Sequence, residues 1–195
     1  MRPLPFRCSA LAALALAVLP AGARATSAIA LDLPSLAGGS DAGVHGRVTR
    51  VQSRWTRDGH LIVTDVEIAV VETLKGPAAQ TVVVVQPGGQ VGDIGQVVSG
   101  LASFSEGEEV VVFLERQGSS RFQVTGLSQG KFRVERSTDG RDAFAVPEAS
   151  DATLVDPSTR APVPSPLRIL ELSELKRQIR AAVRRAPPAR GGGTP

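Results

Sequence analysis

The chain is poor in the side chains that most enzymes use for catalysis. Its 195 residues include one cysteine, two histidines, one tryptophan and no tyrosine. The cysteine, Cys8, lies ahead of an apolar run near the N-terminus, in a segment that we expect to be removed. Without it, the chain forms no disulfide, no thiolate metal site and no cysteine nucleophile. Burial of apolar side chains must then stabilise the fold unaided.

Histidine is nearly as scarce, and this limits hydrolytic chemistry. A hydrolytic triad needs a base beside its nucleophile, and only His45 and His60 supply an imidazole, with Asp41 and Asp58 nearby in sequence. Two imidazoles and a carboxylate form a possible zinc ligand set, although the spacing does not require the two histidines to meet. We predict no catalytic residue, no metal ligand and no cofactor. The alternative is a metal-dependent or hydrolytic enzyme that uses His45 or His60.

The first 25 residues have the three parts of a secretory signal peptide. Arg2 and Arg7 lie in a stretch without acidic residues, the apolar run 9–19 follows, and Ala23 and Ala25 supply the small residues of a cleavage site. The apolar run is too short to span a bilayer, and Cys8 is not at the cleavage site, where a lipoprotein needs its cysteine. We expect cleavage after Ala25, a mature protein in the periplasm or outside the cell, and no transmembrane segment in it.

Removal of this segment changes the net charge. The whole chain has 22 basic and 19 acidic residues, and the segment takes away three arginines and no acid, so the mature chain is formally neutral. A neutral chain gives little support for nucleic-acid binding, and we predict no nucleic-acid partner. The neutrality hides an asymmetry, because residues 167–195 carry a balance of +5 and residues 26–166 a balance of −5.

Short alternating segments predict an all-β domain over residues 26–146. The clearest is 61–73, in which Ile62, Val66 and Ile68 fall on one face. Asp-Gly pairs predict turns at 57–60 and 138–141. The four valines of 82–85 predict a strand that is buried on both faces. Strands are expected at 44–55, 61–73, 81–86, 109–115, 121–125, 131–136 and 142–146, after an apolar lead-in at 28–36 and a loop at 38–43.

The C-terminal third changes in character. Residues 147–166 are rich in Pro, Ser, Asp and Thr, which predicts a linker. In 167–186, a strand and helix segment, Leu175, Ile179 and Val183 recur at helical spacing after a possible N-cap at Ser173. Residues 187–195 are expected to be a disordered tail. The fold prediction is a small antiparallel OB-like barrel with one C-terminal α-helix, and a β-sandwich is the alternative.

The segment 87–95, PGGQVGDIG, is rich in glycine and follows a strand. A phosphate loop needs a helix N-terminus behind it, and its Walker form needs Lys followed by Ser or Thr. The residues after Gly95 are QVVSGLASF, which are apolar and β-branched, and Asp93 would repel an anion. We therefore expect the segment to join two strands. Its glycines would adopt positive φ or let the backbone pass close to a neighbour.

Loops at one end of a rigid β domain are a common place for binding residues. The turn 57–60 and the segment 87–95 are the candidate contact loops. The tryptophan, at the end of a predicted strand, is either packed in the core or an exposed anchor for a partner. The candidate partner-binding residues are Trp55, Arg57, Asp58, His60, Gly88, Gly89, Gln90 and Asp93.

Three stretches, SRWTRDGHLIVTDVEIAVVETLKG, VVVVQPGGQVGDIGQVVSGLASFSEGEEVVVFLE and GLSQGKFRV, resemble a family of uncharacterised exported bacterial proteins. The shared pattern is W-x-x-x-G…I-x-T…LKG…GG…F-x-x-GE…FL…G…G-x-F, and it covers residues 44–134. The resemblance implies an exported β-rich domain and brings no activity or catalytic residue.

A more distant similarity is to the netrin-like, OB-fold domain of tissue inhibitors of metalloproteinases, which also has a long strand ending in a KG turn. Those inhibitors chelate the protease zinc through an N-terminal cysteine, whereas the expected mature chain begins at Thr26. The similarity implies the barrel topology alone, and no inhibitory residue carries over.

Together these features predict an exported, non-catalytic protein-binding module with an unidentified protein partner, an extracellular protease being one candidate that it could bind or regulate. Besides the enzyme, a second alternative is a structural envelope component that is weakly tethered by its basic C-terminal tail.

Overall fold

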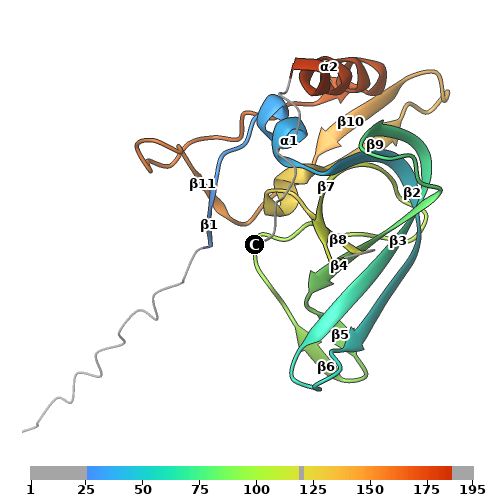
Figure 1. Cartoon of the computed structure of the whole chain (residues 1–195), viewed down its shortest axis with the longest axis vertical. Coiled ribbons are helices and arrows are strands. Elements are labelled where there is room, and N and C mark those ends of the chain that lie inside the picture. Colours follow the sequence, from blue (N-terminus) through green and yellow to red (C-terminus); the bar gives the residue numbers. More distant parts are fainter. Residues whose placement is uncertain (1–25, 119–120, 186–195) are drawn as a thin grey trace, which may run out of the picture.

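The computed structural model describes residues 26–118 and 121–185, and these residues are mostly β-strand (Figure 1). The signal peptide predicted at 1–25 and the tail predicted at 187–195 lie outside the described residues. Neither α-helix in the described ranges is long and apolar enough to cross a membrane. The strands are β1 (Ser27–Ile29), β2 (Ala42–Trp55), β3 (Ile62–Lys75), β4 (Thr81–Pro87), β5 (Gly89–Val91), β6 (Ile94–Gln96), β7 (Glu109–Gln117), β8 (Arg121–Val124), β9 (Lys131–Arg136), β10 (Ala143–Pro147), β11 (Thr153–Val155) and β12 (Leu170–Glu171), and the helices are α1 (Leu33–Gly39), the 3-10 turn η1 (Leu127–Gly130) and α2 (Leu172–Arg185).

One large sheet organises the domain. Its eight strands lie in the order β12-β10-β9-β7-β2-β3-β4-β8, and β8 also pairs with β7. The contact between β4 and β8 is parallel and consists of the pair Val84–Phe122, whereas β7 and β8 are antiparallel over four residue pairs. The ladder that runs from β7 through β2, β3 and β4 therefore returns to β7 through β8.

The longest unit is the hairpin of β2 and β3, which confirms the strands predicted at 44–55 and 61–73 to within two residues at each end. Its turn contains Gly59, which has a φ of 73°, a value that favours glycine. Ile62, Val66 and Ile68 are buried, as their period of two predicts. The register of β2 against β3 shifts between Val48 and Arg50, and the hairpin can bend at this irregularity.

Two apolar cores lie on opposite faces of the sheet. Val110, Val112 and Leu114 belong to the first core, which the faces of β2, β3, β4 and β8 complete. Val111 and Phe113 belong to the second core, beneath α1 and α2. The two-sided burial predicted for the valines of 82–85 is not found in β4, whose residues alternate between buried and half-buried. It is found in β7, which contributes to both cores.

Helix α1 lies where the sequence predicted an apolar lead-in and a loop, and that prediction is wrong. Asp32 caps the helix by accepting a hydrogen bond from Ser35 N at 2.8 Å, and Pro34 occupies the first turn, where it is tolerated. At the other end, Lys75 Nζ donates to the carbonyl of Ala37 at 2.6 Å. The sequence Asp-Leu-Pro contained this start signal, but only seven residues follow it.

Helix α2 confirms the predicted C-terminal helix and shows that it packs on the sheet. Leu175 and Ile179 are fully buried in the second core. The helix begins at Leu172, so Ser173, predicted as its cap, lies inside the first turn. The segment 147–166, predicted as a linker, carries β11, which pairs in parallel with β1.

Candidate functional site

Two hairpin tips lie together at the end of the domain opposite α2 (Figure 1). One is the turn between β2 and β3, and the other is the small hairpin of β5 and β6. They are joined by Gly88 N, which donates to Ile62 O at 2.8 Å, and by Ile62 N, which donates to Gln96 Oε1 at 3.0 Å. The two loops that the sequence singled out are therefore neighbours.

The glycine-rich segment is a β-hairpin and joins two parts of the chain, as expected. Gly89 has a φ of 125°, and a Cβ there would overlap Ser53 Oγ and Thr64 Oγ1. Thr64 Oγ1 also donates to Gly88 O at 2.8 Å. The glycines thus do both things predicted for them, since they adopt positive φ and let β5 cross directly over β2 and β3.

The candidate residues in the first tip are exposed. Asp58 accepts hydrogen bonds from Thr56 Oγ1 at 2.5 Å and from His60 N at 3.3 Å. These bonds stabilise the ionised carboxylate and lower the pKa of Asp58. Arg57 and His60 are exposed beside it. The aspartate therefore fixes the shape of the turn and presents the other side chains to solvent.

In the second tip, Gln90 and Asp93 are exposed, Gly89 is half-buried and Gly88 is buried. Gly88 therefore shapes the hairpin from a buried position. Gln90 Nε2 donates to Gly92 O at 3.1 Å. The side-chain oxygen of Gln90 accepts no hydrogen bond from the other described residues.

The sequence named Trp55 as a possible exposed anchor, but it did not reveal that four more large apolar side chains are exposed at this same end. We call Trp55, Leu61, Ile94, Val97 and Val98 the tip patch. Their exposed fractions are 39%, 50%, 56%, 93% and 38% in that order. Single exposed apolar residues are ordinary, but a group at one end of a monomer is a mark of an interaction site. The run Val97-Val98 between Gly95 and Gly100 was the available signal, since a turn-rich segment rarely buries such a pair.

A groove of about 490 Å³ opens beside the second tip. None of the described residues that line it is charged, and its polar groups are amides and hydroxyls. Its lining comprises Val51, Ser53, Thr64, Val66, Gln86, Pro87, Gly88, Gly89, Gln90, Gly95, Gln96, Val97, Val98, Leu101, Ala102, Ser103 and Phe104. It is therefore suited to an uncharged, partly apolar ligand.

Gln86 is an unusual member of this lining. It is 8% exposed, and its Nε2 donates to Ala102 O at 2.9 Å. Its Oε1 is buried and has no hydrogen-bond partner among the described residues. Leaving a buried acceptor unpaired costs about 1–3 kcal/mol, so this oxygen is an acceptor in need of a donor.

A buried lysine holds one wall of the groove. Lys131 is 1% exposed, and its Nζ lies 2.7 Å from Glu108 Oε1, 3.3 Å from Glu148 Oε2 and 4.7 Å from the centre of the Phe104 ring. It also donates to Ser103 O. Because Ser103 and Phe104 line the groove, this ion cluster fixes the position of that wall. The sequence analysis did not identify it.

His45 lies far from this end, on the face of β2 that supports α2. Its Nε2 is 2.8 Å from Glu109 Oε1, and its Nδ1 is buried without a partner among the described residues. Burial lowers the pKa of His45, although the bond to Glu109 opposes the shift. Burial alone would raise the pKa of Glu109, but the bonds from Arg136 and His45 outweigh it and hold that pKa low.

The structure does not bring His45 and His60 together. His45 is near the start of β2 and His60 is in the turn after its end. In the described ranges, no group of three or more His, Cys, Asp or Glu residues could hold a metal ion. The two-histidine zinc site considered from the sequence is therefore not formed.

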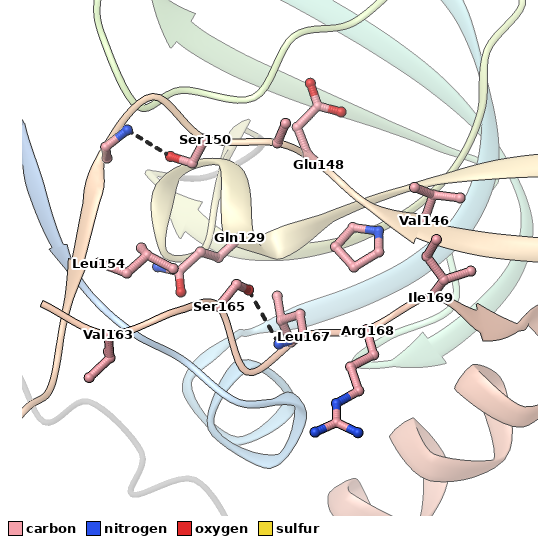
Figure 2. A pocket seen from close by; sticks show the side chains of 13 residues that line it. Gln129, Val146, Glu148, Ser150, Leu154, Val163, Ser165, Leu167, Arg168 and Ile169 are labelled. Carbon is pink, nitrogen blue, oxygen red and sulfur yellow. Dashed lines mark hydrogen bonds between the residues drawn. The ribbon is translucent and has the colours of Figure 1, made fainter.

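A second cavity, of about 620 Å³, lies under the segment that follows β10 (Figure 2). Most of its polar side chains are engaged within the chain. Gln129 binds Leu31 N and Ile29 O, while Ser150 and Ser165 accept hydrogen bonds from backbone N–H groups two residues on. These bonds hold the segment in place, and the exposed Arg168 is the cationic member of the lining.

Comparison of the chain with protein-family models, with curated proteins and with solved structures gave no match. The functional proposal therefore depends on the geometry of the chain's own residues.

Proposed function

We propose that this protein is an exported, non-catalytic protein-binding module built on an OB-like barrel. The pairing of β8 with both β7 and β4 supports the barrel, since it lets five strands form a closed circuit of the kind that OB-folds use. The signal-like composition of residues 1–25 supports export to the periplasm or beyond.

The tip patch is the observation that carries the proposal. Burying each large apolar side chain against a partner contributes about 1.5–3 kcal/mol. A central aromatic or aliphatic anchor surrounded by polar residues is the usual arrangement of a binding hot spot. Here Trp55 and Ile94 are the anchors, while Arg57, His60 and Gln90 belong to the polar rim. The partner is therefore a protein with an apolar patch of its own.

The other functions considered from the sequence have less support. An oligonucleotide needs cations along its path, and the groove has none among the described residues that line it. In the basic helix, Lys176 and Arg180 bind Glu72, so these two cations are engaged within the domain, while Arg184 and Arg185 are exposed. The buried His45–Glu109 pair lies outside the groove.

Capture from the exported fraction of the source cells tests the proposal. Residues 26–195 are immobilised, and bound proteins are compared with those bound by Ile94→Asp and Val97→Asp. A charge in the patch should reduce specific capture about tenfold or more. Val71→Asp is the matched control, because Val71 is 69% exposed on the half of β3 remote from the tips. Equal capture by all four proteins would reject the proposal.

A further inference from the structure

The outer half of β2 has a sheet edge that the described strands leave unpaired. β3 pairs with β2 along its whole length, but β7 pairs with it only over residues 42–47. On the side of β2 that faces β7, two more backbone hydrogen bonds follow. They run from Val48 N to Glu108 O and from Gly107 N to Val48 O, both at 2.8 Å. Beyond them, the N–H of Val51 donates to the side chain of Glu106, and none of the described strands pairs with this side of β2.

The direction of the free backbone groups follows from the ladder. Ile62 directs its N–H to Gln96 and its C=O to Gly88, away from β2. Its partner Trp55 is therefore in a non-hydrogen-bonded pair and directs its own N–H and C=O away from β3. The same alternation applies two residues earlier, at Ser53. Trp55 O accepts a long hydrogen bond from Arg54 Nη1 at 3.5 Å, and the other outward groups of Ser53 and Trp55 offer an edge to which another strand can add.

The uncharged groove lies beside this edge, because Val51 and Ser53 line it. An exposed edge beside walls without charge matches one ligand chemistry, which is the peptide backbone. A strand added to an edge binds through main-chain hydrogen bonds, while pockets beside the edge select its alternate side chains.

We propose that Val51–Trp55 and the groove bind a short, extended and uncharged segment of the partner polypeptide as an added strand. Its backbone pairs with Ser53 and Trp55, and an apolar side chain packs beside Val51, at the side of the groove that β2 forms. This inference rests on the proposed protein-binding function and names the form in which the partner is recognised.

A phage-displayed library of random dodecapeptides, selected on residues 26–195, supplies the probe. Selected peptides should share an uncharged core with apolar residues at alternate positions. In amide hydrogen exchange followed by NMR, a synthetic peptide from the selection should slow exchange at Ser53 and Trp55 about tenfold or more. The N–H of Arg54, which faces β3, should change little. Failure to enrich any peptide, or protection confined to other parts of the chain, would overturn the inference.

Two changes test the hydrogen bonds. Ser53→Pro removes an outward N–H from an edge, where proline is tolerated, and a peptide N-methylated at the residue that pairs with Ser53 loses the N–H that Ser53 O would accept. Each should weaken binding of the peptide about fivefold to tenfold, since one hydrogen bond contributes about 1 kcal/mol. The same peptide N-methylated at a neighbouring residue, whose N–H points away from β2, is the control. Thermal melting verifies the fold of Ser53→Pro, and the N-methylated peptide decides the outcome if that variant does not fold.

Unchanged affinity of the N-methylated peptide would contradict the inference. If peptides fail to bind while capture of a folded protein still depends on Ile94, the proposed function stands and the added strand is wrong. If both fail, the proposed function is wrong as well.

Discussion

Lys176 Nζ lies 2.8 Å from Glu72 Oε2 and so joins helix α2 to strand β3. Arg180, one turn further along the helix, binds the other oxygen of the same carboxylate. Burial would raise the pKa of Glu72, but the two cations outweigh it and lower that pKa. The net negative charge of residues 26–166 and the net positive charge of residues 167–195 thus meet at a specific carboxylate.

Glu72→Gln should loosen α2 without unfolding the domain. The substitution leaves both cations without their carboxylate and should lower the free energy of unfolding by about 1 kcal/mol. Because the folded pKa of Glu72 is lowered, its contribution is present above the unfolded value of 4.5 and is lost as pH falls through the folded pKa. Urea denaturation at pH 7 and at acidic pH measures both effects. Glu135 forms an exposed pair with Arg133, so Glu135→Gln should change the free energy of unfolding by about a few tenths of a kcal/mol at most.

His45 should make the domain less stable in mild acid. Its folded pKa is lowered from 6.5, so the unfolded state binds the proton more readily. Stability from this residue is complete above about pH 6.5 and falls as pH decreases through that value toward the folded pKa. His45→Gln should reduce the difference in unfolding free energy between pH 7.5 and pH 5.5 in urea titrations. His60→Gln, at an exposed position, is the matched control.

Lys131→Met should cost the most stability of the substitutions considered. It leaves Glu108 and Glu148 without their shared cation, and removing one member of a buried ion pair costs about 3–5 kcal/mol. Chemical denaturation measures the loss, and Arg133→Met on the exposed face of the same strand is the control. A loss below about 1 kcal/mol would show that the ion cluster does not fix the groove wall.

Gly89→Ala should displace the β5–β6 hairpin. The new methyl would overlap Ser53 Oγ and Thr64 Oγ1, and the positive φ disfavours alanine, so the cost is about 2 kcal/mol or more. At Gly95, an added methyl would meet no atom of the described residues within 4 Å, and φ is not in the left-handed region, so Gly95→Ala should be nearly neutral. Hydrogen exchange at Gln90 and Gln96 distinguishes the two, with faster exchange expected only for Gly89→Ala.

The parts of the fold that follow from local rules could be predicted from the sequence. The period of two in β3 and the Asp-Gly turn before it defined the β2–β3 hairpin, and the spacing of Leu175 and Ile179 defined α2. The return of β8 to β4 could not be predicted, because the Val84–Phe122 pair joins residues that are distant along the chain.

The candidate site, too, could be predicted from the sequence only in part. The glycines indicated which loop was unusual, and Trp55 indicated an end of the hairpin. Alternation shows which residues share a face, but it does not show whether that face is covered. The exposure of Ile94 and Val97, and the orphaned oxygen of Gln86, depend on how distant segments pack and so became visible only in the structure.

The most direct test of the central claim is hydrogen-exchange mass spectrometry of residues 26–195, with and without the protein that they capture from the exported fraction. The account predicts slower exchange in two segments, 55–61 and 88–98, with that of α1 and α2 unchanged. Protection confined to the helices, or to the cavity under the segment after β10, would contradict it.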